Sequence, residues 1–62
     1  MDNKHAEIPL GFGMALAQNE KAFNNFATLP ESKRNEYIER SHTVKTKYEM
    51  QMLIEEIEKL EI

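Results

Sequence analysis

The stretch Thr46–Glu61, TKYEMQMLIEEIEKLE, carries the clearest helical pattern of the chain. Thr46 and Glu49 have the spacing of a capping box, in which the threonine hydroxyl accepts a hydrogen bond from the glutamate amide and the glutamate reaches back. No proline or glycine occurs between residues 47 and 61, so we expect a helix over that range. Its apolar residues return every three or four positions and form one stripe for burial: Met50, Leu53, Ile54, Ile57 and Leu60.

The segment before this helix predicts a second one over residues 31–42. Pro30 suits the first turn of a helix, where a missing N–H costs nothing. Tyr37 and Ile38 supply its apolar side. The following residues show no helical period, so we expect a connector there with Val44 turned inward.

Further upstream, Asn19 is a good N-cap for a helix over residues 20–28. Ala22, Phe23, Phe26 and Leu29 have the spacing of its buried stripe. This helix ends at Leu29, because a residue that precedes a proline avoids the α conformation.

The opening stretch GFGMAL, residues 11–16, contains both glycines of the chain. The alternation of apolar residues resembles a strand, but no other segment could pair with it, so we expect a short helix over residues 12–17. We interpret Gly11 as a cap and Gly13 as a point of close backbone approach. The stretch lacks the third glycine or the lysine of a phosphate-binding loop.

These patterns predict an all-α bundle of four short helices in a single domain over residues 1–62, with residues 1–8 as a flexible arm. Four short stripes bury enough apolar area only when they share one core. We expect that core to contain the following residues: Phe12, Leu16, Phe23 or Phe26, Leu29, Ile38, Leu53 and Ile57.

Composition narrows the classes of function. The 62 residues include no cysteine, which excludes disulfides and thiolate metal sites. No segment resembles a signal peptide or a membrane span, so we expect a cytoplasmic protein that does not enter a membrane. The net charge of −3 is uneven, because residues 32–48 carry +3 and residues 49–62 carry −4. Such a chain can be self-complementary, within one molecule or between two.

The apolar spacing from Pro9 to Leu29, followed by SKRNEYI at residues 32–38, resembles the C-terminal helical module of the YdeI/OmpD-associated proteins. It is also similar to short stand-alone proteins of Firmicutes with the pattern PLGFGMALAQN, which have no assigned function. In the longer proteins the last helix opens with an arginine-rich run and the third carries a tryptophan, and this chain has neither. The resemblance implies an all-α module and transfers no catalytic residue.

No residues combine into an enzyme or a metal site. Glu39, Ser41 and His42 are close in sequence, but adjacent residues of a helix do not face each other. His5 and Glu7 lack a third ligand at useful spacing. We therefore expect no catalysis, no metal and no cofactor.

A nucleic-acid-binding or regulatory role is the alternative, and it rests on the basic segment 33–47. The acidic balance of the chain and its pI of about 5.3 argue against that role. We expect at most weak, salt-sensitive binding through the five basic residues of the segment: Lys33, Arg34, Arg40, Lys45 and Lys47.

Two residues point to a protein-interaction role. At 100° per residue, Tyr48 and Met52 fall opposite the buried stripe of the last helix, beside Glu55 and Lys59. Either the N-terminal segment covers them, which is the simpler interpretation, or they form a contact surface. Our functional hypothesis is a non-catalytic interaction module that binds an unknown protein partner or a second copy of itself.

Overall fold

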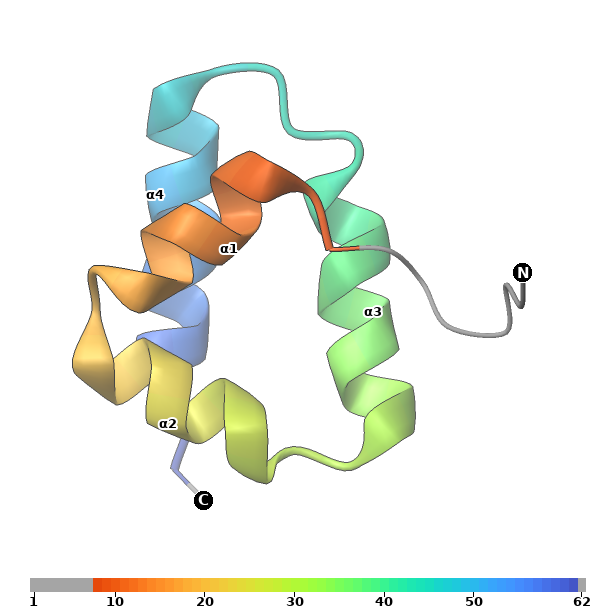
Figure 1. Ribbon diagram of the computed structural model, residues 1–62, viewed down its shortest axis with the longest axis vertical. Coiled ribbons are helices and arrows are strands. Elements are labelled where there is room, and N and C mark those ends of the chain that lie inside the picture. The colour runs from red at the N-terminus through yellow and green to blue at the C-terminus, as the bar shows by residue number, and fades with distance from the viewer. Residues whose placement is uncertain (1–7, 62) are drawn as a thin grey trace.

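The computed structural model describes residues 8–61, and within them the chain folds into four helices without a strand. The helices are α1 (Leu10–Ala17), α2 (Glu20–Thr28), α3 (Glu31–Ser41) and α4 (Lys47–Glu58). Helix α4 packs against each of the other three, and most extensively against α2 (Figure 1). The prediction of an all-α bundle of four helices is confirmed.

The ends of the helices differ from the predicted ones by up to three residues. Helix α1 begins two residues early because the Pro9 carbonyl already accepts from the Gly13 amide at 2.9 Å. Helix α4 ends at Glu58 rather than at residue 61, with a tight turn in which the Leu60 amide donates to the Ile57 carbonyl. Helix α3 ends one residue early, at Ser41.

The interpretation of the two glycines is wrong. Both lie inside α1, and neither has a positive φ angle. A β-carbon added at Gly11 would meet nothing within 4 Å, and one at Gly13 would meet only the Ile8 side chain at 3.6 Å, an ordinary contact. The backbone at neither position therefore requires glycine.

The core lies between α4 and the other helices. Phe12 and Ile57 are fully buried, and the Phe12 ring meets the Phe26 ring edge to face, with centroids 5.6 Å apart. Of the two phenylalanines offered for the core, Phe26 is buried, whereas Phe23 is 51% exposed. Leu29 is only partly buried. The buried apolar residues are Phe12, Leu16, Ala22, Phe26, Tyr37, Ile38, Leu53, Ile54 and Ile57.

Two side chains cap helix starts as the sequence predicts. The Asn19 side chain accepts from the Ala22 amide, and the Thr46 hydroxyl accepts from the Glu49 amide, both at 3.0 Å. The reciprocal half of the capping box differs, because the Glu49 carboxylate accepts from the amide of Lys45 at 2.8 Å. Val44 is turned inward as expected and packs against the core.

The predicted arm over residues 1–8 falls, except for Ile8, outside the described residues. Ile8 itself is half-exposed and precedes α1.

Candidate protein-interaction surfaces

Tyr48 and Met52 lie one turn apart on the outer side of α4, and both are exposed. Tyr48 is 68% exposed and Met52 is 50% exposed. Of the segment before Phe12 that was expected to cover them, the structure describes residues 8–11, and these leave both side chains exposed. We call this pair the Tyr48–Met52 surface.

Met52 also forms one wall of an open hollow between α4 and the connector after α3. This hollow encloses about 520 Å³. Val44 and Leu53 give it an apolar lining, and Arg40 and Glu56 are among the charged residues around it. Five of the nine residues that line it are charged: Arg40, Glu49, Glu55, Glu56 and Lys59.

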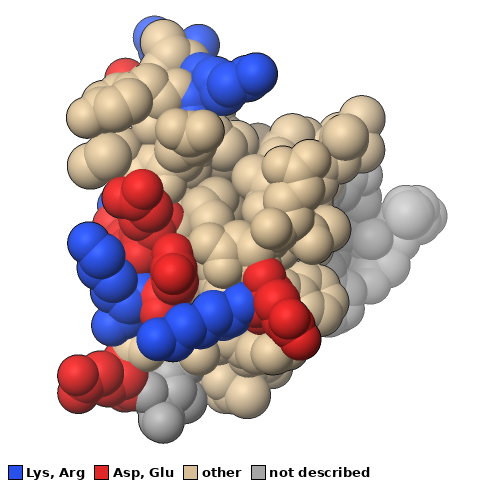
Figure 2. Space-filling view, turned by 90° about the vertical axis from the view of Figure 1, so that its left-hand side faces the viewer, with Lys and Arg blue, Asp and Glu red and all other residues tan. Residues whose placement is uncertain are grey.

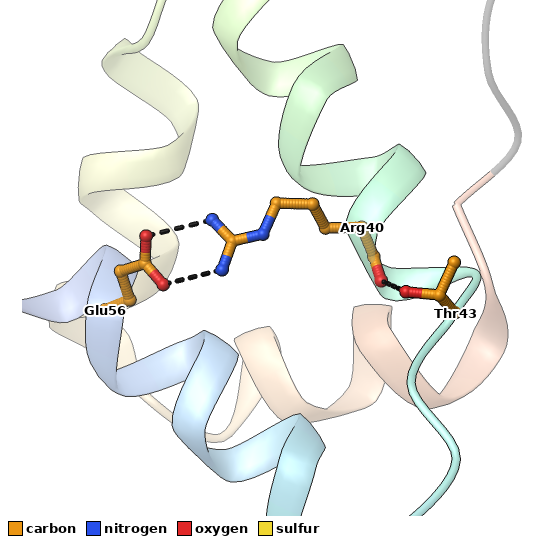
Figure 3. Close-up of polar contacts among 3 residues, drawn as sticks. All are labelled: Arg40, Thr43 and Glu56. Carbon is orange, nitrogen blue, oxygen red and sulfur yellow. Dashed lines mark hydrogen bonds and ion pairs between the residues drawn. The ribbon is translucent and has the colours of Figure 1, made fainter.

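An ion pair joins α3 to α4 beside this hollow. The two terminal nitrogens of Arg40 donate to the two carboxylate oxygens of Glu56 at 2.8 and 2.9 Å (Figure 3). The Arg40 guanidinium also lies 5.5 Å from the centre of the Tyr37 ring. The Thr43 hydroxyl donates to the Arg40 carbonyl at 2.9 Å and closes the last turn of α3.

The pair shifts the pKa of both of its members. The hydrogen bonds from Arg40 lower the pKa of Glu56 below the carboxyl's ordinary value, and the same bonds raise the pKa of Arg40. Both shifts favour the charged forms, so both members of the pair carry their charges at neutral pH.

The basic segment 33–47 does not form one cluster of free cations. Lys33 pairs with Glu36 at 3.4 Å, Arg34 donates to the Leu29 carbonyl, and Arg40 pairs with Glu56. Lys33 and Arg40 are also separated by about 10 Å along the α3 axis, at 1.5 Å per residue. Three of the five predicted residues are thus held by contacts within the chain.

The other two basic residues, Lys45 and Lys47, lie together at the edge of a second hollow, between α1 and the start of α4. This hollow encloses about 570 Å³. Met14 and Met50 contribute apolar side chains to it, and Gly11 lies in its wall. Within residues 8–61, no acidic side chain forms an ion pair with either lysine.

The sequence interpretation missed the outer side of α1 as a surface. Leu10 and Met14 lie one turn apart there and are 77% and 54% exposed. Residues 10–19 include no charged side chain, and Figure 2 shows a broad uncharged area beside the charged part of the molecule. The sequence did indicate this exposed face, because GFGMAL forms a helix that is apolar on every side and a small domain cannot bury all sides of such a helix.

Two polar residues with structural roles were also missed. The Asn25 side-chain amide donates to the carbonyls of Ile57, Glu58 and Leu60 at 3.0 to 3.2 Å. Buried Ser41 donates to the Ile38 carbonyl at 2.6 Å, so its hydroxyl is engaged within its own helix.

Across residues 8–61, no three His, Cys, Asp or Glu side chains converge on a point where an ion could bind. None of the helices described in that range is long and apolar enough to cross a membrane. His5 and Glu7 lie outside the described residues.

A comparison with protein families identifies the group to which the helices belong. The family model described as "Bacteriocin-protection, YdeI or OmpD-Associated" matches residues 5–49, which include α1, α2, α3 and the first turn of α4. The chain belongs to this family. The search of curated proteins and the search of solved structures each give no match. The matched range includes Leu10, Met14 and the two exposed lysines, Lys45 and Lys47. Met52 falls outside it.

Proposed function

We propose that this member of the family is a non-catalytic protein-interaction module of the cytoplasm that binds a partner protein through the Tyr48–Met52 surface. One observation carries the proposal: an aromatic side chain and a methionine stand exposed one turn apart on α4. We also propose that the chain corresponds to the C-terminal helical module of the longer proteins of the family and to the short stand-alone proteins of Firmicutes.

The chemistry of the surface supports a protein partner. Aromatic residues and methionine are enriched in the centres of protein interfaces, and methionine adapts its shape to different partners. Glu55 and Lys59 flank the pair and would form the polar rim. The hollow beside Met52 offers room for a side chain of the partner.

Binding of nucleic acid has less support. Three of the five basic residues are engaged in contacts within the chain, and only Lys45 and Lys47 remain for phosphate. A pair of cations gives weak binding that salt removes.

A photoreactive phenylalanine analogue at position 48, used in the native cell, tests whether a partner contacts this surface. We expect one cross-linked protein from position 48. The matched control places the same analogue at position 23, because Phe23 is also a half-exposed aromatic but lies on α2. Identical products from both positions would contradict a specific surface.

The double substitution Tyr48→Ser, Met52→Ser then tests what the side chains contribute. We expect capture of the cross-linked protein to be lost, while the helical circular-dichroism signal and the melting midpoint stay nearly unchanged. Phe23→Ser should leave capture intact. A large fall in melting temperature in a monomeric protein would show instead that the pair belongs to the core.

A further inference from the structure

The outer side of α1 is an apolar helix face that residues 8–61 leave uncovered. A helix that is apolar all round is normally buried on all sides. Here Phe12 and Leu16 face the core, but Leu10 and Met14 on the other side remain exposed. Leu10 and Met14 lie on α1, whereas Tyr48 and Met52 lie on α4, and Glu55 borders both surfaces.

A seam between α1 and α4 continues this face, and its two ends carry opposite charges. The hollow at one end has Lys45 and Lys47 in its wall. An adjoining hollow of about 320 Å³ has Glu55 and Glu58 in its wall. Both hollows share the uncharged residues Ala15, Gln18 and Gln51, so neutral surface separates the lysines from the glutamates.

Figure 2 shows uncharged surface between two charged areas. Its vertical direction is that of Figure 1, in which α4 starts at the top. Basic side chains and one acidic group lie at the upper edge, uncharged surface follows, and carboxylates outnumber the basic side chains among which they lie in the lower half.

We propose that this face binds a second copy of the chain and forms a two-fold symmetric dimer. A two-fold axis through the neutral middle of the seam places the lysine end of one copy against the glutamate end of the other, twice. Each Lys47 then comes opposite Glu55 of the partner copy, while Leu10 and Met14 become buried. The apolar contact supplies the affinity and the charges set the orientation.

The charge pattern favours a second copy over a membrane as the occupant. An anionic bilayer would attract Lys45 and Lys47 but would repel Glu55 and Glu58 at the other end of the same face. A second copy offers the required opposite charges at the same spacing, because it is the same surface turned around.

Charge reversal tests the symmetry directly, with sedimentation equilibrium as the measurement. Lys47→Glu alone and Glu55→Lys alone each place like charges together at both contacts of the dimer. We expect each variant to dimerise about tenfold more weakly than the parent. Mixing the two variants should restore dimers, because every contact in the mixed dimer joins opposite charges. The doubly exchanged chain should also dimerise.

These substitutions should not unfold the chain. Position 47 lies in the first turn of α4, where an acidic residue suits the helix dipole, and position 55 lies toward the end where a basic residue suits it. Glu39→Lys on α3 is the matched control and should dimerise like the parent. Tyr48→Ser, Met52→Ser should also remain dimeric, which keeps this test independent of the proposed function.

The double substitution Leu10→Ser, Met14→Ser tests the apolar contact of the proposed dimer and should give a folded monomer. A dissociation constant in the millimolar range already corresponds to weak binding. A parent chain that stays monomeric at about millimolar concentration would therefore overturn the proposal. A mixture of the two charge variants that fails to form dimers would also overturn it. A large loss of stability in the monomeric Leu10→Ser, Met14→Ser variant would overturn it too, because it would mean that the chain itself covers these side chains. Binding of the parent to anionic vesicles through Leu10 and Met14 would identify a lipid surface instead.

Discussion

Gly11 and Gly13 reduce the stability of the helix that contains them. Both have ordinary helical backbone angles, and both have room for a methyl group. Glycine in a helix interior costs about 0.5–1 kcal/mol relative to alanine, because the unfolded chain loses more conformational freedom.

We therefore expect Gly11→Ala and Gly13→Ala each to raise the free energy of unfolding by about 0.5–1 kcal/mol. Chemical denaturation of the single and double variants measures this, and the two effects should nearly add. Because Gly11 lies in the wall of the seam, each denaturation should be done at a concentration where the protein is monomeric. A lower stability of the monomeric alanine variants would contradict the conclusion that the two glycines destabilise α1.

At the scale of helices, α3 is joined to α4 through an ion pair at the surface as well as through the core. The Arg40 and Glu56 side chains are each about half exposed, so the pair contributes only about 0.2–1 kcal/mol. Because the pKa of Glu56 is lowered in the fold, its charged form is favoured there. The contribution is present above the ordinary carboxyl pKa of 4.5 and is lost as the pH falls through the lowered value.

Glu56→Gln should therefore be less stable than the parent at pH 7 by about 0.2–1 kcal/mol. The difference should shrink as the pH is lowered from about 5 towards 3, because the parent then protonates Glu56 as well. Urea denaturation at both pH values measures the two differences, with Glu39→Gln as an exposed control, because Glu39 has no ion-pair partner among residues 8–61. A difference that stays constant with pH would show that the charge of Glu56 is not responsible.

At the scale of the whole molecule, one shared core holds four helices that are each too short to be stable alone. Ile57 is fully buried at its centre, on the helix that contacts all the others. Ile57→Ala should cost about 2–5 kcal/mol, which approaches the entire stability of a domain of this size. Thermal melting followed by circular dichroism measures the loss. Tyr48→Ala, at an exposed position, is the control and should melt like the parent, whereas an unchanged midpoint for Ile57→Ala would mean that the core has been misassigned.

The sequence alone predicts the features of this fold that depend on near neighbours. Asn19 and Thr46 cap their helices through bonds to residues three positions away, and the stripe of α4 follows from helical period. The Arg40–Glu56 pair was not predictable, because it depends on the angle at which α3 and α4 pack. The exposed side of α1 was missed for a similar reason. The spacing of apolar residues does not show which side faces the core when a helix is apolar all round.

The Asn25 amide also has a consequence for how substitutions are tolerated. Its three acceptors are main-chain carbonyls at positions 57, 58 and 60, and every amino acid supplies such a group. The donor, in contrast, requires a side-chain amide of the right length at position 25. We expect the end of α4 to accept many side chains without losing this contact, whereas position 25 accepts few. A single side chain on α2 thus holds the main chain at the end of α4, whereas the side chains at residues 57, 58 and 60 take no part in this contact.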